Sequence, residues 1–286
     1  MNDAHRVVIV GGGFGRLYAA LGLKRCPARI TLIDKRNFHV FQPLLYQVAT
    51  SGLSPGDISS PLRNVLRRHK NLQVRLAEVI DVDLPRQLVI LKDSAVEYDT
   101  LVVAAGSENH YFGNSGWADT APALKSLEDA EEMHRRILLA FESAEFETSE
   151  AERSAWMTFV IVGAGLTGVE LAGALVEVAK DTLREDFRSI DTDRARVILV
   201  EAGNRVLNAF PPKLSQKARD ALEGAGVTVK TNTFVLDIDP DRVRIKTGED
   251  QDEIRCKTVL WAAGVKPSSL TGKLAERTGA PTGRAA

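Results

Sequence analysis

Cysteine is scarce in this sequence, and its scarcity excludes several kinds of site. Cys26 and Cys256 are the only two among 286 residues, and they lie far apart. Two separated cysteines cannot form a disulfide scaffold, a Cys-x-x-Cys redox pair or a four-cysteine zinc site. The five histidines show no metal-ligand spacing. We therefore expect no metal site, and a reducing, cytoplasmic setting.

An excess of one charge and a long apolar run are also lacking. Lys plus Arg number 37 against 38 Asp plus Glu, and this balance gives no electrostatic argument for nucleic-acid binding. No run approaches the roughly 18 apolar residues of a membrane-spanning helix, and no basic leader or cleavage site opens the sequence. Apolar residues make up 44% and charged residues 26%, as in an average globular protein. The length predicts about two domains.

A strand, a glycine-rich turn and a helix are predicted twice. The first copy is VVIVGGGFGR over 7–16, and the second is FVIVGAGLTG over 159–168. Each β-branched run is typical of a parallel strand that is buried on both faces. A glycine turn between such a strand and a helix can hold a pyrophosphate at the helix N-terminus. The sequence therefore predicts an α/β fold with two Rossmann-like dinucleotide-binding domains.

The second motif meets every requirement of such a site. Gly163, Gly165 and Gly168 stand in the Gly-x-Gly-x-x-Gly register. Glu201 ends the next predicted strand, 197–200, although a long helix and loop separate it from Gly163. An acid at that place accepts hydrogen bonds from a ribose and repels a 2′-phosphate. We expect a dinucleotide with a non-phosphorylated adenosine ribose.

The first motif departs from the pattern at one position. Gly11 and Gly13 fit, and Asp34 follows the next strand at the usual distance, but Arg16 stands where the third glycine belongs. A side chain forced into that close helix–strand contact costs about 1–3 kcal/mol. The arginine could instead extend toward the phosphates and add a charged contact. Both a working and a weakened nucleotide site stay open.

Local patterns predict the remaining elements. Ser126 is a candidate N-cap, with Asp129 three residues on, for a helix over 126–146. Loops are expected over 37–56 and from Gly264 onward. The other predicted helices cover 58–68, 168–188 and 213–223, and the other strands cover 29–33, 73–80, 87–91, 100–104, 227–230, 234–239, 243–246 and 257–261.

Five stretches together resemble bacterial type II NADH dehydrogenases, which are NADH:quinone oxidoreductases. They run in order along essentially the whole chain, and FQPLLYQVATSGLSP is the most specific. They are 10–20 (VGGGFGRLYAA), 41–55 (FQPLLYQVATSGLSP), 101–106 (LVVAAG), 163–174 (GAGLTGVELAGA) and 258–265 (TVLWAAGV). The resemblance implies a glutathione-reductase-like pair of domains, with FAD bound by 1–121, NADH bound by 122–262, and a return segment to the FAD domain over 263–286.

The resemblance also implies site residues. Glu170 would point toward the nicotinamide and the flavin as the catalytic residue, although a carboxylate this near a helix N-terminus also stabilises the helix dipole. The residues implied for FAD are Gly11, Gly13, Phe14, Gly15, Asp34, Lys35, Pro43, Leu44, Gln47, Glu78, Val79, Ala105 and Gly106. Those implied for NADH are Gly163, Gly165, Thr167, Gly168, Glu170, Glu201, Gly264 and Val265.

The activity implied by the resemblance is hydride transfer from NADH to FAD, followed by two-electron transfer to a quinone. If a C-terminal anchor exists, we expect a peripheral protein on the cytoplasmic face of the inner membrane, and otherwise a soluble one. A homodimer is left open. Members of this group continue past a Gly-Arg pair, here Gly283-Arg284, so we expect a C-terminal truncation and an incomplete flavin domain. Two alternatives stand beside this hypothesis: another two-domain flavoprotein reductase, and a non-catalytic NADH-binding module.

Overall fold

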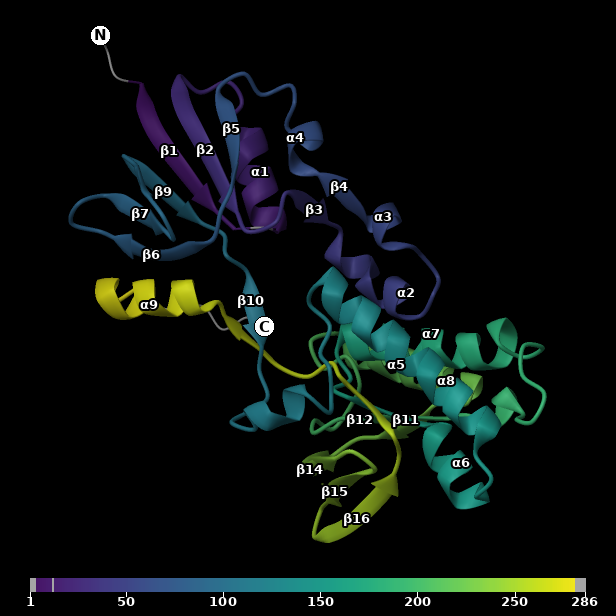
Figure 1. Cartoon of the computed structure of the whole chain (residues 1–286). Coiled ribbons are helices and arrows are strands. Elements are labelled where there is room, and N and C mark those ends of the chain that lie inside the picture. The colour runs from purple at the N-terminus through teal and green to yellow at the C-terminus, as the bar shows by residue number, and fades with distance from the viewer. Residues whose placement is uncertain (1–3, 12, 281–286) are drawn as a thin grey trace. The chain divides into compact units, whose positions relative to one another are not determined.

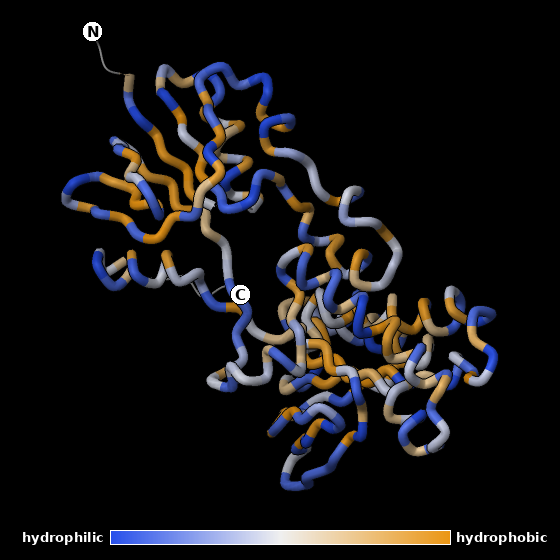
Figure 2. The backbone as a smooth tube through the Cα atoms, viewed as in Figure 1, coloured by the Kyte–Doolittle hydropathy of each residue, from blue (hydrophilic) through white to orange (hydrophobic). Residues whose placement is uncertain are grey.

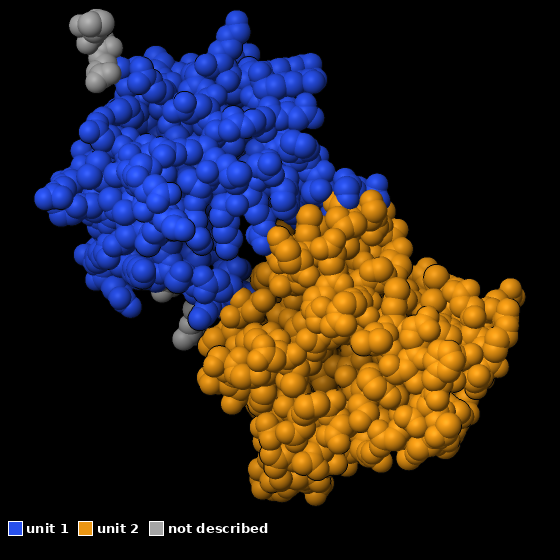
Figure 3. Space-filling model, viewed as in Figure 1, with its two compact units in different colours: residues 1–41, 56–108, 265–285 blue, residues 42–55, 109–264, 286 orange. Residues whose placement is uncertain are grey.

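The described chain divides into two units (Figure 3). Their sheets repeat the same arrangement of strands (Figure 1). The computed structural model describes residues 4–11 and 13–280. Of the described residues, the first unit comprises those within 4–41, 56–108 and 265–280, and the second comprises 42–55 and 109–264. Each contains a four-stranded parallel sheet and a three-stranded antiparallel sheet. The predicted α/β class with two Rossmann-like domains is confirmed.

The parallel sheet of the first unit has the order β5-β2-β1-β9. Its strands are β1 (His5–Val10), β2 (Ala28–Asp34), β5 (Leu72–Leu76) and β9 (Thr100–Val103). Val7 and Ile9 pack with Ala20 of α1 (Phe14–Gly22) on one face. Val8 and Val10 pack on the other face against β6 (Val79–Asp83), β7 (Leu88–Leu91) and β8 (Ala95–Glu97). Burial of both faces explains why β1 is apolar from Val7 to Val10.

Short elements complete the first unit. They are α3 (Pro55–Ile58), the antiparallel pair β3 (Phe38–Val40) and β4 (Ser59–Pro61), α4 (Leu62–Val65), the pair β10 (Ser107–Asn109) and β18 (Val265–Pro267), and α9 (Ser269–Thr278). Leu270 of α9 joins the core beneath β1. Arg277 of α9 donates two hydrogen bonds to the carboxylate of Asp81, at 2.8 and 2.9 Å. These contacts fix the last described helix to the antiparallel sheet.

The parallel sheet of the second unit has the order β13-β12-β11-β17. Its strands are β11 (Thr158–Val162), β12 (Arg196–Val200), β13 (Thr228–Lys230) and β17 (Thr258–Trp261). The antiparallel strands β14 (Thr233–Asp239), β15 (Arg242–Thr247) and β16 (Asp250–Arg255) share an apolar core with one face. Helices α5 (Leu127–Phe146), α6 (Glu150–Trp156), α7 (Leu166–Glu177) and α8 (Pro212–Ala225) complete the unit. Figure 2 shows apolar residues concentrated along the parallel strands of both sheets.

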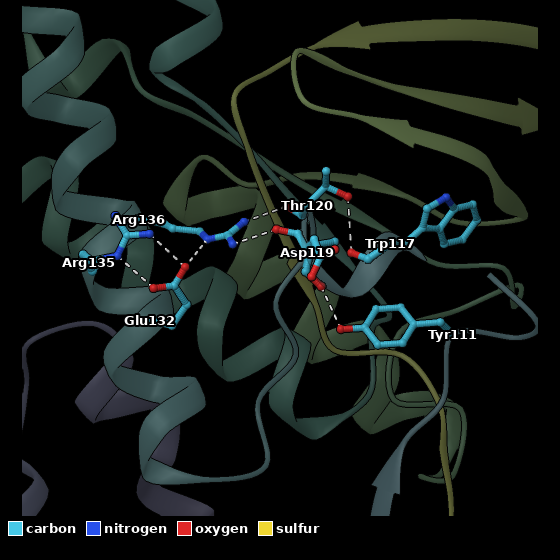
Figure 4. A network of polar contacts seen from close by, with 8 residues as sticks. Tyr111, Trp117, Asp119, Thr120, Glu132, Arg135 and Arg136 are labelled. Atoms are coloured by element: carbon cyan, nitrogen blue, oxygen red, sulfur yellow. Dashed lines mark hydrogen bonds and ion pairs between the residues drawn. The ribbon is translucent and has the colours of Figure 1, made fainter. Parts of the chain in front are cut away.

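Helix α5 begins at the predicted cap. The Ser126 hydroxyl accepts a hydrogen bond from the Asp129 amide, and the Asp129 carboxylate accepts one from the Ser126 amide. A polar network then ties α5 to the segment before it (Figure 4). Arg136 donates to the backbone carbonyls of Asp119 and Thr120, at 2.7 and 3.0 Å, and to the Glu132 carboxylate at 2.7 Å. The segment before α5 contains the 3-10 turn η2 (Ser115–Ala118), and these hydrogen bonds hold it to α5 just after that turn.

Several local predictions are wrong. The predicted helix over 58–68 is a strand and the short α4, and the strand over 73–80 is divided between β5 and β6 at residues 77–78. Helix α7 continues only as a π-turn, Val178–Thr182, and ends well before 188. The unpredicted helices and strands are α2 (Leu45–Ala49), α3, β3, β4, β8, α6, β10, β16, β18 and α9. Within the described part of the chain, no helix has the length and apolarity to cross a membrane.

Candidate nucleotide-binding sites

The second glycine turn is built so closely that only glycine fits at two of its positions. Gly163 follows β11 with φ of +99°, and a Cβ there would lie 2.7 Å from Cα of Ala263. Gly168, in the first turn of α7, would place a Cβ 1.8 Å from the Gly163 carbonyl oxygen. Gly165 is the N-cap of α7, and no atom lies within 4 Å of where its Cβ would be. Open space at a helix N-terminus is suited to a pyrophosphate.

Glu201 lies at this turn, as predicted from its place after the strand. One carboxylate oxygen accepts the amide of Ala164, and the other accepts the amide of Gly203, both at 2.7 Å. The side chain is only partly buried. A carboxylate offers about four acceptor positions, so Glu201 retains capacity for ribose hydroxyls. The structure thus brings Glu201 and the three glycines together.

Helix α7 also carries the residues predicted for the nicotinamide end. Thr167 and Glu170 are both half-buried. Burial raises the pKa of the Glu170 carboxyl. Gly264, at the end of the second unit, has φ of +70°, and a Cβ there would lie 2.6 Å from the Phe112 ring. Val265 begins β18 in the first unit. The roles of these residues toward a ligand stay predictions.

The described glycines of the first turn resemble their counterparts in the second. Gly11 has φ of +122°, and a Cβ there would lie 1.9 Å from the Ala104 carbonyl oxygen. Gly13 is the N-cap of α1 and has open space beside it. Gly15 faces the Ala104 methyl group, 3.6 Å from where its own Cβ would lie. The Phe14 ring packs edge-on against the rings of His39 and Phe41.

Asp34, the acid predicted to bind the ribose at the first turn, forms an ion pair with a buried arginine. Arg16 is fully buried, and its guanidinium forms an ion pair and hydrogen bond with one carboxylate oxygen of Asp34. The other oxygen accepts the Arg36 amide at 2.6 Å. Burial raises the pKa of the Asp34 carboxyl, while the Arg36 amide and the Arg16 charge oppose the rise. The prediction that Arg16 could extend toward the phosphates is wrong for this structure, because its side chain is enclosed.

The other first-unit candidates lie around the ends of the parallel strands. Asp34 ends β2, and its carbonyl accepts the Ala77 amide at 2.9 Å, which holds the next strand connection beside it. Lys35 and Glu78 are exposed, and Val79 begins β6. Ala105 lies after β9, with its amide nitrogen 2.7 Å from where a Gly11 Cβ would be. Gly106 follows with φ of +74°. The structure therefore gathers Gly11, Asp34, Glu78 and Ala105 at one edge.

The FQPLLYQVATSGLSP stretch is not a simple loop. Pro43 and Leu44 lie in a 3-10 turn, Gln42–Leu44, which leads into α2. Helix α2 packs on α5 and α7 and buries Leu45, Val48 and Ala49. Gln47 is half-buried, and its carbonyl accepts the amides of Gly52 and Leu53. Core packing in the second unit therefore accounts for much of this stretch.

Sequence reasoning missed two parts of these sites. Ala104 and Ala263 form the wall against which Gly11 and Gly163 pack. A signal existed, because the triplet Ala-Ala-Gly follows the last parallel strand in both halves, at 104–106 and 262–264. The pairing of Arg16 with Asp34 had no such signal, since spacing alone does not show where a long side chain turns.

Two Rossmann-like domains, each with a glycine turn and an acid after the next strand, define a dinucleotide-binding oxidoreductase fold. The chain belongs to the family described as pyridine nucleotide-disulphide oxidoreductase, which matches residues 5–285. The resemblance to type II NADH dehydrogenases is confirmed by curated relatives.

The chain is 49% identical over 279 residues to the type II NADH:quinone oxidoreductase NdhA of Mycobacterium tuberculosis, covering 95% of this chain and 59% of that protein. It is 44% identical to Ndh of the same organism, covering 96% and 60%. The chain thus spans about three-fifths of the length of these relatives. NDH2 of Plasmodium falciparum, solved in complex with NADH, has the same fold at a TM-score of 0.88 and 23% identity, covering 94% of this chain and 57% of that one.

Proposed function

We propose that this chain functions as an FAD-dependent NADH:quinone oxidoreductase, with FAD in the first unit and NADH in the second. The observation that carries the proposal is the second turn. Gly163 and Gly168 leave no room for side chains, Gly165 leaves open space at the start of α7, and Glu201 stays partly exposed. The names of the Mycobacterium tuberculosis relatives support the choice of NADH and a quinone.

In the second unit, the amides at the start of α7 would bind the pyrophosphate of NADH. Glu201 would accept hydrogen bonds from the adenosine ribose and repel a 2′-phosphate, so the unit would favour NADH over NADPH. Thr167, Gly264 and Val265 would contact the nicotinamide half. Glu170 would act beside the reacting ring, where its half-buried carboxyl can hold or release a proton.

In the first unit, Gly11 and the N-cap Gly13 would admit a pyrophosphate as their counterparts do, since the same cradle exists there. The flavin supplies the chemistry, because it takes a hydride and passes two electrons on. The fit is incomplete, because Asp34 is buried against Arg16. The residues assigned to FAD are the first-unit residues Gly11, Gly13, Phe14, Gly15, Asp34, Lys35, Glu78, Val79, Ala105 and Gly106, together with Pro43, Leu44 and Gln47, which belong to the second unit. The corresponding domains are 1–121 for FAD and 122–262 for NADH, with 263–286 as the return segment.

An absorbance spectrum of the purified chain tests this function. A flavin band that persists after removal of free FAD, bleaches with NADH and returns with a soluble quinone is the expected result. A retained flavin that NADH does not bleach would contradict the proposal. Because quinones partition into lipid, the proposal also places the protein on the cytoplasmic membrane surface, and flotation with lipid vesicles tests that part.

A non-catalytic NADH-binding module is the second candidate. The buried Arg16–Asp34 pair favours it, since this pair affects only the first turn. A colourless protein that binds NADH in isothermal titration and never retains FAD would support this candidate and exclude the oxidoreductase.

A further inference from the structure

We propose that Arg16 occupies the ribose subsite of the first unit and thereby weakens its hold on a dinucleotide. The inference rests on the proposed function in one respect: it takes FAD as the dinucleotide of this unit. It goes beyond that function because it assigns an affinity-setting role to a residue of this chain.

Equivalent backbone contacts show that Arg16 and Gly168 hold the same position in their turns. The amide of Gly11 donates to the carbonyl of Ile33 as that of Gly163 donates to Val200. The N-caps of the two helices are Gly13 and Gly165. The third residue after each cap is Arg16 in α1 and Gly168 in α7. A side chain is therefore present in one turn where the other has none.

The two ribose acids differ in access to a ligand. Glu201 accepts the amide of Ala164 in the glycine turn and the amide of Gly203 in its own loop, and it is partly exposed. Asp34 is 6% exposed, and one of its oxygens is bound by the Arg16 guanidinium while the other accepts the Arg36 amide. A ribose hydroxyl must reach a carboxylate oxygen to donate to it. The Arg16 side chain, which is 0% exposed, must therefore move before a ribose can bind.

Moving the arginine is unfavourable. Separating a buried ion pair leaves two charges without compensation in a medium that solvates them poorly. This penalty is subtracted from the binding free energy of any ligand that uses Asp34. Hydrogen bonds to a charged group typically change affinity by about 10- to 100-fold. We expect removal of the Arg16 side chain to raise FAD affinity within this range.

The test is a titration of FAD with the full chain and with its Arg16→Gly variant. Binding is measured by the quenching of flavin fluorescence. The variant is expected to bind FAD at least about 10-fold more tightly, with the same NADH affinity as the parent chain. Equal or weaker FAD binding by the folded variant overturns the inference. Absence of FAD binding in both proteins overturns it too, and also removes FAD from the proposed function. Loss of NADH binding in the parent chain contradicts only the proposed function.

Two further variants separate this role from a structural one. Arg16→Ala removes the guanidinium without adding a third glycine to α1, so it decides the case if Arg16→Gly does not fold. Its melting temperature should rise more on FAD addition than that of the parent chain, and equal rises would contradict the inference. Tyr18→Ala is the matched control, because Tyr18 lies on the same helix and is 69% exposed. It should leave FAD affinity unchanged.

Discussion

The two glycine turns of this chain share their described glycine positions but differ at the third motif position, where the first turn has Arg16 and the second has Gly168. Both have a positive-φ glycine at the strand end, a glycine N-cap and an acid after the neighbouring strand. In the second turn the acid is partly exposed, whereas in the first it is enclosed by Arg16. The comparison teaches that the backbone of a dinucleotide motif persists even when the carboxylate that would contact the ligand is paired with another side chain of the protein. Fold and readiness to bind are separate properties of the motif.

The strongest test of this comparison places the arginine in the second turn. Gly168→Arg should abolish measurable NADH binding, a loss of at least about 100-fold, because even a Cβ there would lie 1.8 Å from the Gly163 carbonyl. Isothermal titration with NADH measures the loss. Gly173→Ala is the matched control on the same helix, since a Cβ at Gly173 meets nothing within 4 Å. Undiminished NADH binding by Gly168→Arg would show that the third glycine is dispensable.

The next test compares the two acids in folding stability. Asp34→Ala removes the carboxylate that pairs with the buried Arg16 guanidinium and should lower the free energy of unfolding of the first unit by about 3–5 kcal/mol. Glu201→Ala removes hydrogen bonds from a partly exposed group and should cost about 1–2 kcal/mol. Urea denaturation, monitored by circular dichroism and tryptophan fluorescence, measures the loss of unfolding free energy in each variant. Equal losses would mean that the burial of the Asp34 pair is unimportant.

A smaller effect is expected on cofactor choice. Glu201→Gln keeps the size of the side chain but removes the charge that repels a 2′-phosphate. NADH affinity should fall about 10-fold, because hydrogen bonds from the ribose to a charged acceptor become bonds to a neutral one. NADPH affinity should fall less or rise, so the ratio of the NADPH dissociation constant to the NADH dissociation constant should decrease. An unchanged ratio of the two dissociation constants would place the adenosine ribose elsewhere.

The smallest effect lies away from both turns, in the network of Figure 4. Hydrogen bonds from Arg135 and then Arg136 lower the pKa of Glu132 to about 2. A carboxyl whose folded pKa is depressed stabilises the fold above its ordinary pKa of 4.5, and this contribution is lost as the pH falls toward 2. Glu132→Gln should therefore lower stability at pH 7 by less than about 1 kcal/mol, since the pair is partly exposed. The difference from the parent chain should shrink below pH 4.5, and a constant difference in melting temperature would contradict this origin.

Periodic and capped elements were predictable, because their signals are local. Ser126 and Asp129 identified the start of α5, and the runs before Gly11 and Gly163 identified buried parallel strands. Elements stabilised by distant contacts were not predictable. Strand β16 is mostly polar and pairs only because β15 lies beside it, and α2 forms because Leu45 and Val48 pack on other helices. The Arg16–Asp34 contact depends on the direction of one side chain, which periodicity does not report.

The discontinuity of the first unit has a consequence for biosynthesis. Its antiparallel sheet is held by Arg277 and Leu270 of α9, while its parallel strands lie within residues 5–103. Most of the second unit is translated between these segments. At ~5–20 residues per second, the nascent first unit waits on the order of ten seconds or more on the ribosome before α9 emerges. During this interval the surface that Leu270 later covers is available to chaperones, and the second unit can fold first.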